Sequence, residues 1–353
     1  MKVAHFIDSG GLYGAEKMLL TLCKEQIKLG LEPLIVSCGV IDEPPKALEI
    51  ACEKEGVPCL PWRMKPGLNL SGCKNLLKHL EPMKFDVFHS HGYKFNILLA
   101  LLTIRPTNYQ LVATIHGETK SSGPNKITLF QFADRMLRFR FDKIVHVTTQ
   151  NRASKARRVI FNGINIPKNN NSPAPTNPTK VITIGTLGRL SQEKNYSFLI
   201  DAMHHLKSKN LKIKCKIHGE GSLQSSLQEQ IEKLQITDTV SILPFTKNIA
   251  EFFDSIDIYI NCSTTEGMPI SLLEAAAFNK RVIASNINGN KTLLNKLYSN
   301  PILFDFSHDA FEYAIESALK APISEIIAAR ENISELFSGS SMAKQYYLLY
   351  KEA

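Results

Sequence analysis

The sequence has no apolar run long enough to cross a membrane. Its longest clean run covers residues 97 to 104, and the apolar stretch before the glycines at positions 10 and 11 is shorter still. A membrane-spanning helix needs about 20 apolar residues, and the core of a signal peptide about 7 to 15. We therefore expect a cytoplasmic protein that contacts a membrane, if at all, only peripherally at the inner face of the cell membrane.

Closely spaced cysteines are also missing. The seven cysteines stand at positions 23, 38, 52, 59, 73, 215 and 262, and no two have the spacing of a metal site. Their number is odd and they are scattered, so we expect reduced thiols and no disulfides. His89 and His91 alternate at the end of an expected strand, but no third ligand is evident. We therefore expect no metal site.

Neither common glycine fingerprint for nucleotides is present. Residues 8 to 17, DSGGLYGAEK, place three glycines between an apolar run and a helical pattern. A dinucleotide-binding turn needs G-x-G-x-x-G and an acidic residue after the second strand, which here ends in Ser37 and Cys38. A P-loop needs lysine and serine or threonine where this loop has alanine and glutamate. The spacing alone leaves open a phosphate-binding loop or a tight turn without a ligand.

Charge is divided unevenly along the chain. Residues 1 to 170 carry 24 Lys and Arg against 14 Asp and Glu, and the remainder carries 18 against 19. A basic half suggests nucleic acid or an acidic membrane surface as partner, although scattered lysines can also simply keep a surface solvated. Residues 127 to 141 combine aromatic and basic residues at helical spacing, and residues 151 to 158 add four further basic residues. This pattern is typical of a membrane-surface patch or of a helix that faces the core.

Strand-like apolar runs alternate with helical segments in both halves. With 353 residues, the chain exceeds one comfortable core, and residues 165 to 180 hold four prolines and five asparagines. We expect an N-terminal domain at 1–165, a linker at 166–180 and a C-terminal domain at 181–335. Alternating strands and helices predict an α/β fold with two Rossmann-like, doubly wound parallel sheets facing a cleft. Strands are expected at 2–7, 31–38, 86–89, 111–116, 144–148, 180–188, 212–221, 240–245, 256–263 and 281–285.

Two loops of the second half carry charges where a parallel sheet binds ligands. Arg189 and Lys194 follow the strand at 180–188, and two cations beside helix N–H groups suit a diphosphate. Glu266 lies in a loop, and Glu274 lies in the helix that Pro269 opens. A carboxylate can accept from both hydroxyls of a ribose. Alternatively, these are solvated charges or a glutamate that complements the helix dipole.

The order of the motifs resembles that of the retaining GT-B glycosyltransferases, particularly glycosyltransferase family 4. The two glutamates of EGMPISLLE, residues 266 to 274, are separated by seven residues, as in that family. The resemblance covers residues 1 to about 290 and implies that a last helix, 336–353, returns to the first domain. The supporting motifs are the Gly-Gly loop at 10 and 11, DVFHSHG (86–92), TIHGE (114–118), FNGIN (161–165), GRLSQEKN (188–195), IHGEG (217–221) and ILPF (242–245).

The resemblance also implies roles for individual residues. Arg189 and Lys194 would neutralise the donor diphosphate, Glu266 would hold the transferred sugar, and Glu274 would bind the ribose. His116 would lie against the sugar from the other domain. The expected catalytic set is His116, Glu266, Arg189 and Lys194. The expected donor-binding set is Gly10, Gly11, Gly219, Glu220, Phe245, Gly267, Met268, Pro269, Ile270 and Glu274, and the acceptor side is Tyr13, Glu16 and His91.

The implied activity is a retaining, metal-independent transfer from a nucleotide diphosphate sugar to an acceptor hydroxyl. The sequence lacks the D-x-D motif of metal-dependent transferases, and cations with helix-start N–H groups can stabilise the departing diphosphate. We expect no cofactor, a UDP-sugar in preference to a GDP-sugar, and no nucleic-acid partner. The acceptor would be a glycan or lipid-linked molecule of bacterial surface polysaccharide, lipopolysaccharide or glycolipid synthesis.

Several alternatives remain open at this point. For the chemistry, we favour front-face attack with the diphosphate as base, and Glu266 as nucleophile is the alternative. For the function, a non-catalytic two-domain protein that binds nucleotide sugars is the main alternative. A dinucleotide-dependent oxidoreductase is less favoured because both fingerprints are missing, and a nucleic-acid-binding protein would leave the glutamates and cations of the second half unexplained.

Overall fold

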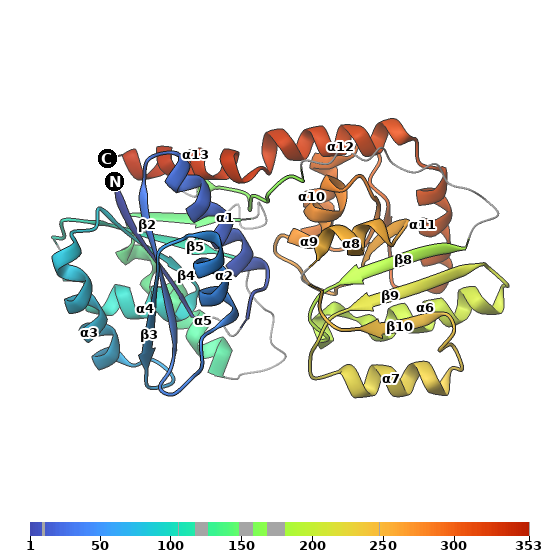
Figure 1. Ribbon diagram of the computed structural model, residues 1–353, viewed down its shortest axis with the longest axis horizontal. Coiled ribbons are helices and arrows are strands. Elements are labelled where there is room, and N and C mark those ends of the chain that lie inside the picture. The colour runs from blue at the N-terminus through green and yellow to red at the C-terminus, as the bar shows by residue number, and fades with distance from the viewer. Residues whose placement is uncertain are drawn as a thin grey trace. The chain divides into compact units, whose positions relative to one another are not determined.

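The computed structural model describes residues 1–8, 11–104, 106–116, 126–147, 158–167, 181–246 and 248–352, with only the backbone at 126 and 127. The chain divides into two compact units (Figure 1). The first unit comprises Met1–Asn165 and Leu336–Ala353, and the second comprises Ile166–Glu335. Of the expected linker, residues 168 to 180 lie outside the described ranges. Each unit is described by itself.

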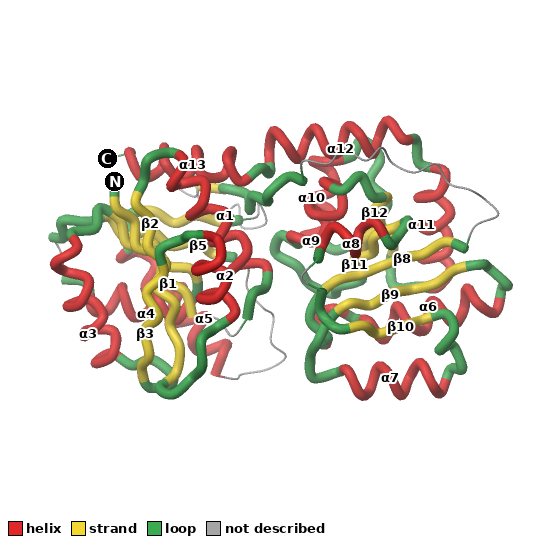
Figure 2. Tube along the Cα trace, viewed as in Figure 1, coloured by secondary structure: helices red, strands yellow, loops and turns green. Residues whose placement is uncertain are grey.

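A parallel sheet of seven strands forms the centre of the first unit, in the order β3-β2-β1-β4-β5-β6-β7. The order reverses between β1 and β4, where doubly wound sheets bind ligands at their carboxyl edge. Helices flank the yellow strands in Figure 2. The strands are β1 (Lys2–Asp8), β2 (Glu32–Val40), β3 (Cys59–Met64), β4 (Val87–His91), β5 (Gln110–Ile115), β6 (Lys143–His146) and β7 (Arg158–Val159), and the helices are α1 (Gly14–Lys28), α2 (Ala47–Glu55), α3 (Leu70–Leu80), η1 (Glu81–Met83), α4 (Tyr93–Leu102), α5 (Lys126–Leu137) and η2 (Arg138–Arg140).

The last helix, α13 (Gly339–Lys351), belongs to the first unit and lies along α1 (Figure 1). The N–H of Ile164 donates to the carbonyl of Phe337, and the N–H of Gly339 donates to the carbonyl of Ile164, both at 2.9 Å. A Cβ on Gly339 would lie 2.6 Å from Cγ2 of Thr21 in α1, so the close approach of the two helices requires glycine. Tyr346 and Tyr350 are thereby buried against the sheet.

The second unit has a parallel sheet of six strands in the order β10-β9-β8-β11-β12-β13, which reverses between β8 and β11. The central strands β8, β11 and β12 consist mostly of buried residues, whereas β9 alternates buried and more exposed side chains. The strands are β8 (Ile182–Leu187), β9 (Ile213–His218), β10 (Val240–Leu243), β11 (Ile258–Asn261), β12 (Arg281–Ser285) and β13 (Leu303–Phe304), and the helices are η3 (Gln192–Lys194), α6 (Tyr196–Ser208), α7 (Gln224–Lys233), α8 (Ile249–Asp254), α9 (Ile270–Ala277), α10 (Asn288–Leu297), α11 (His308–Lys320) and α12 (Ile323–Leu336).

The expected fold class, two parallel-sheet α/β domains, is confirmed. The sequence analysis missed β3, which contains Pro61. Proline is tolerated there because β3 is the edge strand of its sheet, where a missing N–H need not break a ladder. Among the described residues, no helix is both long enough and apolar enough to cross a membrane.

Candidate functional site

Three loops of the second unit meet at the carboxyl edge of its sheet. The N–H of Gly188 donates to the carbonyl of His218 at 3.0 Å, and the N–H of Leu190 donates to that of Glu220 at 2.9 Å. A Cβ on Gly219 would lie 1.9 Å from the carbonyl oxygen of Gly188, so only glycine fits at this contact. The N–H of Gly219 also donates to the carbonyl of Leu243, the last residue of β10. The motifs GRLSQEKN, IHGEG and ILPF are therefore neighbours.

Glu266 is the centre of a cluster of hydrogen bonds in this region. Its Oε1 accepts from Nζ of Lys194 at 2.6 Å, from Oγ of Ser263 at 2.7 Å and from Nδ2 of Asn261 at 3.4 Å. The loop that carries it packs tightly, because a Cβ on Gly289 would lie 2.2 Å from the carbonyl oxygen of Glu266. Both side chains of the Lys194–Glu266 pair are only partly exposed, at 24% and 13%. Their charges are therefore fixed in place yet within reach of solvent.

Buried polar side chains behind Glu266 hold this cluster. Nδ2 of Asn290 donates to Oδ1 of Asn261 and to the carbonyl and hydroxyl oxygens of Ser285. The hydroxyl of Ser285 donates to the carbonyl of Ser263 at 2.6 Å. The sequence analysis missed Asn261, Ser263, Ser285 and Asn290. For Asn261, Ser263 and Ser285 the signal was polar side chains at the ends of adjacent apolar strands, in INCS and VIAS, whereas Asn290 lies in α10 and had no such signal.

Arg189 lies in the same loop as Lys194 and is paired within it. Nη2 of Arg189 is 2.8 Å from Oε1 of Glu193, and the Arg189 side chain is 55% exposed. Burial raises the pKa of Glu193, but hydrogen bonds from Ser191, from its own backbone N–H and from Arg189 outweigh burial and hold the pKa below its usual value. The carbonyl of Glu193 accepts from the N–H of Thr264 at 2.9 Å, which joins this loop to the one carrying Glu266.

The helix α9 carries the second glutamate of the motif. Pro269 is the residue before its first turn, with extended backbone angles, so α9 begins at Ile270. Glu274 lies one turn inside α9, close enough to contribute to the raised pKa of buried Tyr259, whose main cause is burial. Met268 and Ile270 are buried at the start of the helix.

In the first unit, His116 follows β5 and lies beside three other histidines. Its Nε2 is 3.2 Å from Nδ1 of His91, and Nε2 of His91 is 3.0 Å from Nδ1 of His5. His89 contacts Tyr350 through Nδ1 and Thr114 through Nε2, both at 2.7 Å. Burial lowers the pKa of His5 and His116 to about 4 and, together with the neighbouring histidines, holds those of His89 and His91 well below the usual value.

The expectation that His89 and His91 lack a third neighbour was wrong. His5, 84 residues from His89, brings a ring nitrogen within 4.8 Å of both. The sheet order places β1 directly beside β4, which sequence spacing could not show. Every ring nitrogen of these three histidines already has a hydrogen-bond partner, so the arrangement gives no support to a metal site. A second group, His205, Asp309 and Glu312, lies at the surface of the second unit.

The opening loop of the chain is partly described. Gly10 lies outside the described residues, whereas a Cβ on Gly11 would lie 2.3 Å from the ring of Tyr13. The carboxylate of Glu16 accepts from the N–H of Tyr13 at 2.9 Å and so satisfies a donor at the start of α1. Glu16 is buried, and Tyr13 is 46% exposed. The acceptor-side roles of Tyr13, Glu16 and His91 stay predictions.

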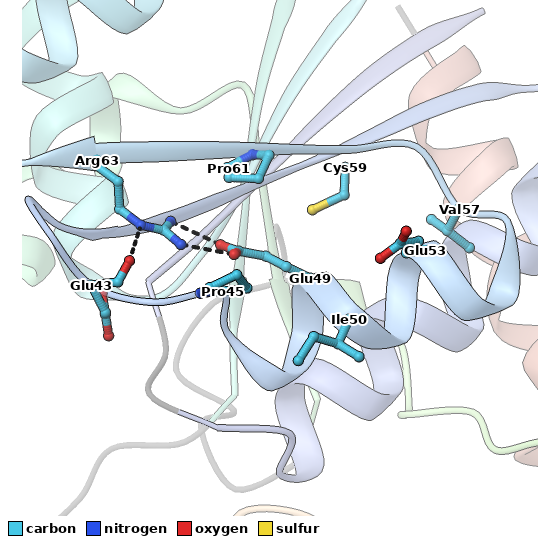
Figure 3. Close-up of a pocket in the computed structure, with 9 residues that line it drawn as sticks. All are labelled: Glu43, Pro45, Glu49, Ile50, Glu53, Val57, Cys59, Pro61 and Arg63. Carbon is cyan, nitrogen blue, oxygen red and sulfur yellow. Dashed lines mark hydrogen bonds and ion pairs between the residues drawn. The ribbon is translucent and has the colours of Figure 1, made fainter.

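A hollow of about 450 Å³ lies between α2 and β3 of the first unit (Figure 3). Arg63 pairs there with Glu49 through both terminal nitrogens, at 2.9 and 2.8 Å. None of the expected site residues lines the hollow, and two further glutamates face it, which makes it unsuited to a phosphate. Its lining residues are Glu43, Pro45, Glu49, Ile50, Glu53, Val57, Cys59, Pro61 and Arg63.

Helix α5 and the turn after it expose a row of apolar side chains, here called the α5 patch. The patch consists of Leu129, Phe132, Met136 and Phe139, whose exposed fractions are 66%, 60%, 60% and 79%. The spacing of three and four residues places Leu129, Phe132 and Met136 on one face of α5, and Phe139 follows in η2. Arg135 is exposed beside them. These apolar positions therefore do not form core.

Proteins of related sequence are glycosyltransferases. An uncharacterised glycosyltransferase of Haemophilus influenzae is 30% identical over 41% of this chain and 42% of its own length. The α-monoglucosyldiacylglycerol synthase of Streptococcus pneumoniae is 28% identical over 48% of this chain and 39% of its own length. The chain thus spans less than half the length of these curated relatives.

Solved structures share the fold over the whole chain. HepE of Anabaena, in complex with UDP and glucose, gives a TM-score of 0.81 at 18% identity and covers 100% of both chains. A mutant TarM of Staphylococcus aureus, in complex with fondaparinux, α-GlcNAc-glycerol and UDP, gives 0.80 at 13% identity, covering 99% of this chain and 100% of TarM.

Two family models match adjoining parts of the chain. The model described as Glycosyltransferase Family 4 matches residues 13–168, and the model described as Glycosyl transferases group 1 matches residues 167–335. The two matches follow one another in the order of the two domains and leave only the ends of the chain uncovered. The chain belongs to the group 1 glycosyl transferases of glycosyltransferase family 4.

Proposed function

We propose that the protein transfers a sugar from a nucleotide diphosphate sugar to an acceptor hydroxyl, with retained anomeric configuration and without a metal ion. The observation that carries this proposal is the cluster around Glu266, where Lys194 and two polar side chains converge on one carboxylate oxygen. The cluster lies at the carboxyl edge of a doubly wound sheet, next to its switch point, where such sheets bind their ligands.

The departing diphosphate is the group that this site can stabilise. Breaking the bond between the sugar and the diphosphate leaves negative charge on the phosphate oxygens, which the cations of Arg189 and Lys194 oppose. The start of α9, where Pro269 makes no side-chain cap hydrogen bond, adds the partial positive charge of the helix dipole at the same sheet edge. Arg189 and Lys194 are held by Glu193 and Glu266, so an incoming diphosphate exchanges one anionic partner for another.

Retention by front-face attack fits the surroundings of Glu266 better than a covalent intermediate. Its Oε1 is already occupied by three donors, which stabilise the carboxylate and weaken it as a nucleophile. In the front-face step, the bond from the anomeric carbon to the diphosphate oxygen breaks while the acceptor oxygen bonds to that carbon on the same face. The proton of the acceptor hydroxyl passes to the departing diphosphate oxygen.

The donor we propose is a UDP-sugar. Glu274, one turn inside α9, is suited to accept from the two hydroxyls of a ribose. Two fold neighbours, HepE and TarM, are described in complex with UDP, which supports uridine over guanosine. The relative from Streptococcus pneumoniae is named for a glucosylated diacylglycerol, which supports a glycolipid or other lipid-linked acceptor.

We further propose that the α5 patch rests on an anionic membrane surface. Its four apolar side chains are exposed at 60% or more, and the neighbouring Arg135 is exposed as well. Residues 1 to 170 carry 24 Lys and Arg against 14 Asp and Glu, so the charge is complementary to acidic lipid headgroups. An apolar helix face with basic neighbours binds such a surface reversibly.

A binding screen followed by a turnover assay tests the proposed transfer. The first step measures the thermal unfolding midpoint with UDP, GDP and their sugars, because a ligand that binds the folded state raises it. The second step measures release of the nucleoside diphosphate from the donor that binds best. A protein that binds a nucleotide sugar but neither transfers nor slowly hydrolyses it would be the non-catalytic binder, and the enzyme proposal would be withdrawn.

A further inference from the structure

His116 is one end of a chain of hydrogen bonds that crosses the sheet of the first unit. The chain runs from His116 through His91 to His5, with nitrogen–nitrogen distances of 3.2 and 3.0 Å. Nε2 of His5 then donates to Oε1 of Gln26 in α1 at 2.9 Å. Nε2 of Gln26 donates to the hydroxyl of Tyr350 in α13 at 3.5 Å. Segments far apart in sequence, β1, β4, α1 and α13, therefore contribute to one network.

Gln26 determines the direction of every donation along this chain. Its Oε1 has only lone pairs, so His5 must carry its proton on Nε2. The tautomers then follow from the network, because the other nitrogen of a neutral imidazole accepts. Nδ1 of His5 accepts from Nε2 of His91, and Nδ1 of His91 accepts from Nε2 of His116. His116 is left with its proton on Nε2 and a lone pair on Nδ1.

A second branch of the network fits the same direction. The hydroxyl of Tyr350 accepts from Gln26 and can donate to Nδ1 of His89 at 2.7 Å. Nε2 of His89 then donates to Oγ1 of Thr114 at 2.7 Å, and that hydroxyl shares a hydrogen bond of 2.9 Å with the hydroxyl of Tyr346. This branch begins at Tyr350, and its hydrogen bonds do not include His116.

The network requires that the imidazole rings of His5, His91 and His116 are neutral. Burial favours the neutral form of each ring because it disfavours charge. His5, Gln26 and His91 are buried. Burial lowers the pKa of His5 and His116 to about 4, and burial with the neighbouring His89, His5 and His116 holds that of His91 well below the usual value. At neutral pH each of these rings carries a single proton, so the position of that proton in one ring dictates its position in the next.

The outer end of the chain is an unsatisfied acceptor. Nδ1 of His116 is buried and makes no hydrogen bond to any residue in the described ranges. A buried lone pair without a donor costs free energy, and a ligand group with an O–H removes that cost on binding. Among the described residues, this nitrogen is the point at which the network ends without a partner.

We propose that Gln26 is a positioning residue that, through His5 and His91, fixes the tautomer of His116 so that Nδ1 accepts a hydrogen bond from a sugar hydroxyl. The identity of the hydroxyl as that of a sugar rests on the proposed function, whereas the control of the tautomer rests on the hydrogen bonds of the first unit. The arrangement is selective, because a phosphate oxygen without a proton finds no donor at Nδ1. His116 thus accepts a neutral hydroxyl and rejects an anion.

Nuclear magnetic resonance of the full chain, labelled with ¹⁵N-histidine, reads the tautomers directly. The ten histidines give a resolvable set of ring signals, and His116→Phe assigns the signals of His116 by their loss. At pH 7 we expect Nε2 of His116 to be protonated and Nδ1 to show the shift of an unprotonated nitrogen. A wild-type protein with the proton of His116 on Nδ1 overturns the proposal without any further variant.

Gln26→Met removes the acceptor at nearly unchanged volume. We expect the Nδ1 signal of His116 to move toward its protonated position, because the tautomer is no longer fixed. Tyr346→Phe is the matched control, since it deletes a buried hydroxyl on the other branch, and it should leave the His116 signals unchanged. An unchanged Nδ1 shift in folded Gln26→Met overturns the proposal. Where Gln26→Met does not fold, His5→Phe interrupts the same branch and carries the same expectation.

Activity is a separate readout. We expect Gln26→Met to lower kcat/KM about fivefold, roughly the factor for one neutral hydrogen bond, with the nucleotide affinity unchanged. If the histidines show the expected tautomers but the protein transfers no sugar, the role of Gln26 is supported and the proposed function is overturned. An active enzyme whose His116 carries its proton on Nδ1 would support the proposed function and overturn the role of Gln26.

Discussion

Lys194 and Glu266, 72 residues apart in the chain, form an ion pair of 2.6 Å at the carboxyl edge of the second sheet. The pair joins the two motifs in which the sequence analysis placed its cations and its carboxylates. In the proposed function, the cation of this pair serves the diphosphate and the carboxylate holds the sugar.

The first prediction concerns Lys194. Lys194→Ala should lower kcat by a factor on the order of 100 or more, because it removes a cation that opposes charge on the leaving diphosphate. The measurement is the steady-state rate of nucleoside diphosphate release. Lys209→Ala is the control, because Lys209 is a surface lysine of the same unit that pairs with Glu312. Equal rates in wild type and Lys194→Ala would remove Lys194 from the catalytic set.

The second prediction concerns Glu274. Glu274→Ala should weaken nucleotide binding by about 10- to 100-fold, the range for losing hydrogen bonds to a charged acceptor. Isothermal titration with UDP gives the Kd. Glu229→Ala, on the exposed face of α7, should bind UDP like the wild type. A Kd that does not change in Glu274→Ala would show that this carboxylate does not hold the ribose.

The third prediction concerns the α5 patch. Replacing Phe132 and Phe139 by serine should reduce sedimentation with vesicles that contain anionic lipid, because the apolar area available to the membrane falls. Added salt should weaken binding of the wild type by screening its basic residues. Tyr313→Ser is the control, since Tyr313 is 73% exposed on the second unit. No wild-type binding at low salt would contradict the membrane proposal.

The fourth prediction concerns pH. A histidine whose pKa falls from 6.5 in the unfolded chain to about 4 when folded binds fewer protons in the folded state, so stability is retained above pH 6.5 and decreases as the pH falls toward 4. For His5 the loss is on the order of 2 kcal/mol by pH 5. The other groups around it, His89, His91 and His116, also have lowered pKa values and act in the same direction.

Trp62 provides the measurement for this pH dependence. It is the single tryptophan of the chain and lies in β3 of the first unit, which contains the histidines. We expect the urea midpoint of its fluorescence change to fall between pH 7 and pH 5. In that range carboxylates such as Glu49, whose pKa is held low by Arg63 despite burial, stay ionised. A midpoint that is constant across this range would mean that the histidines accept protons when folded.

The sequence by itself predicted both sheets, the loops that carry Lys194 and Glu266, and the helix that carries Glu274. This was possible because strand and helix periodicities are local, and because parallel strands present their carboxyl ends at one edge. It missed β3, since a proline hides an edge strand from a pattern based on apolar runs.

Tertiary structure alone decided which side chains meet. Strand order places His5 of β1 beside His91 of β4, and helix packing places Gln26 and Tyr350 against them. Packing also decided that the four apolar side chains of the α5 patch are exposed, which helical spacing left open. These outcomes depend on contacts between segments distant in sequence, and such contacts are fixed by the free energy of burying whole elements and not by any local pattern.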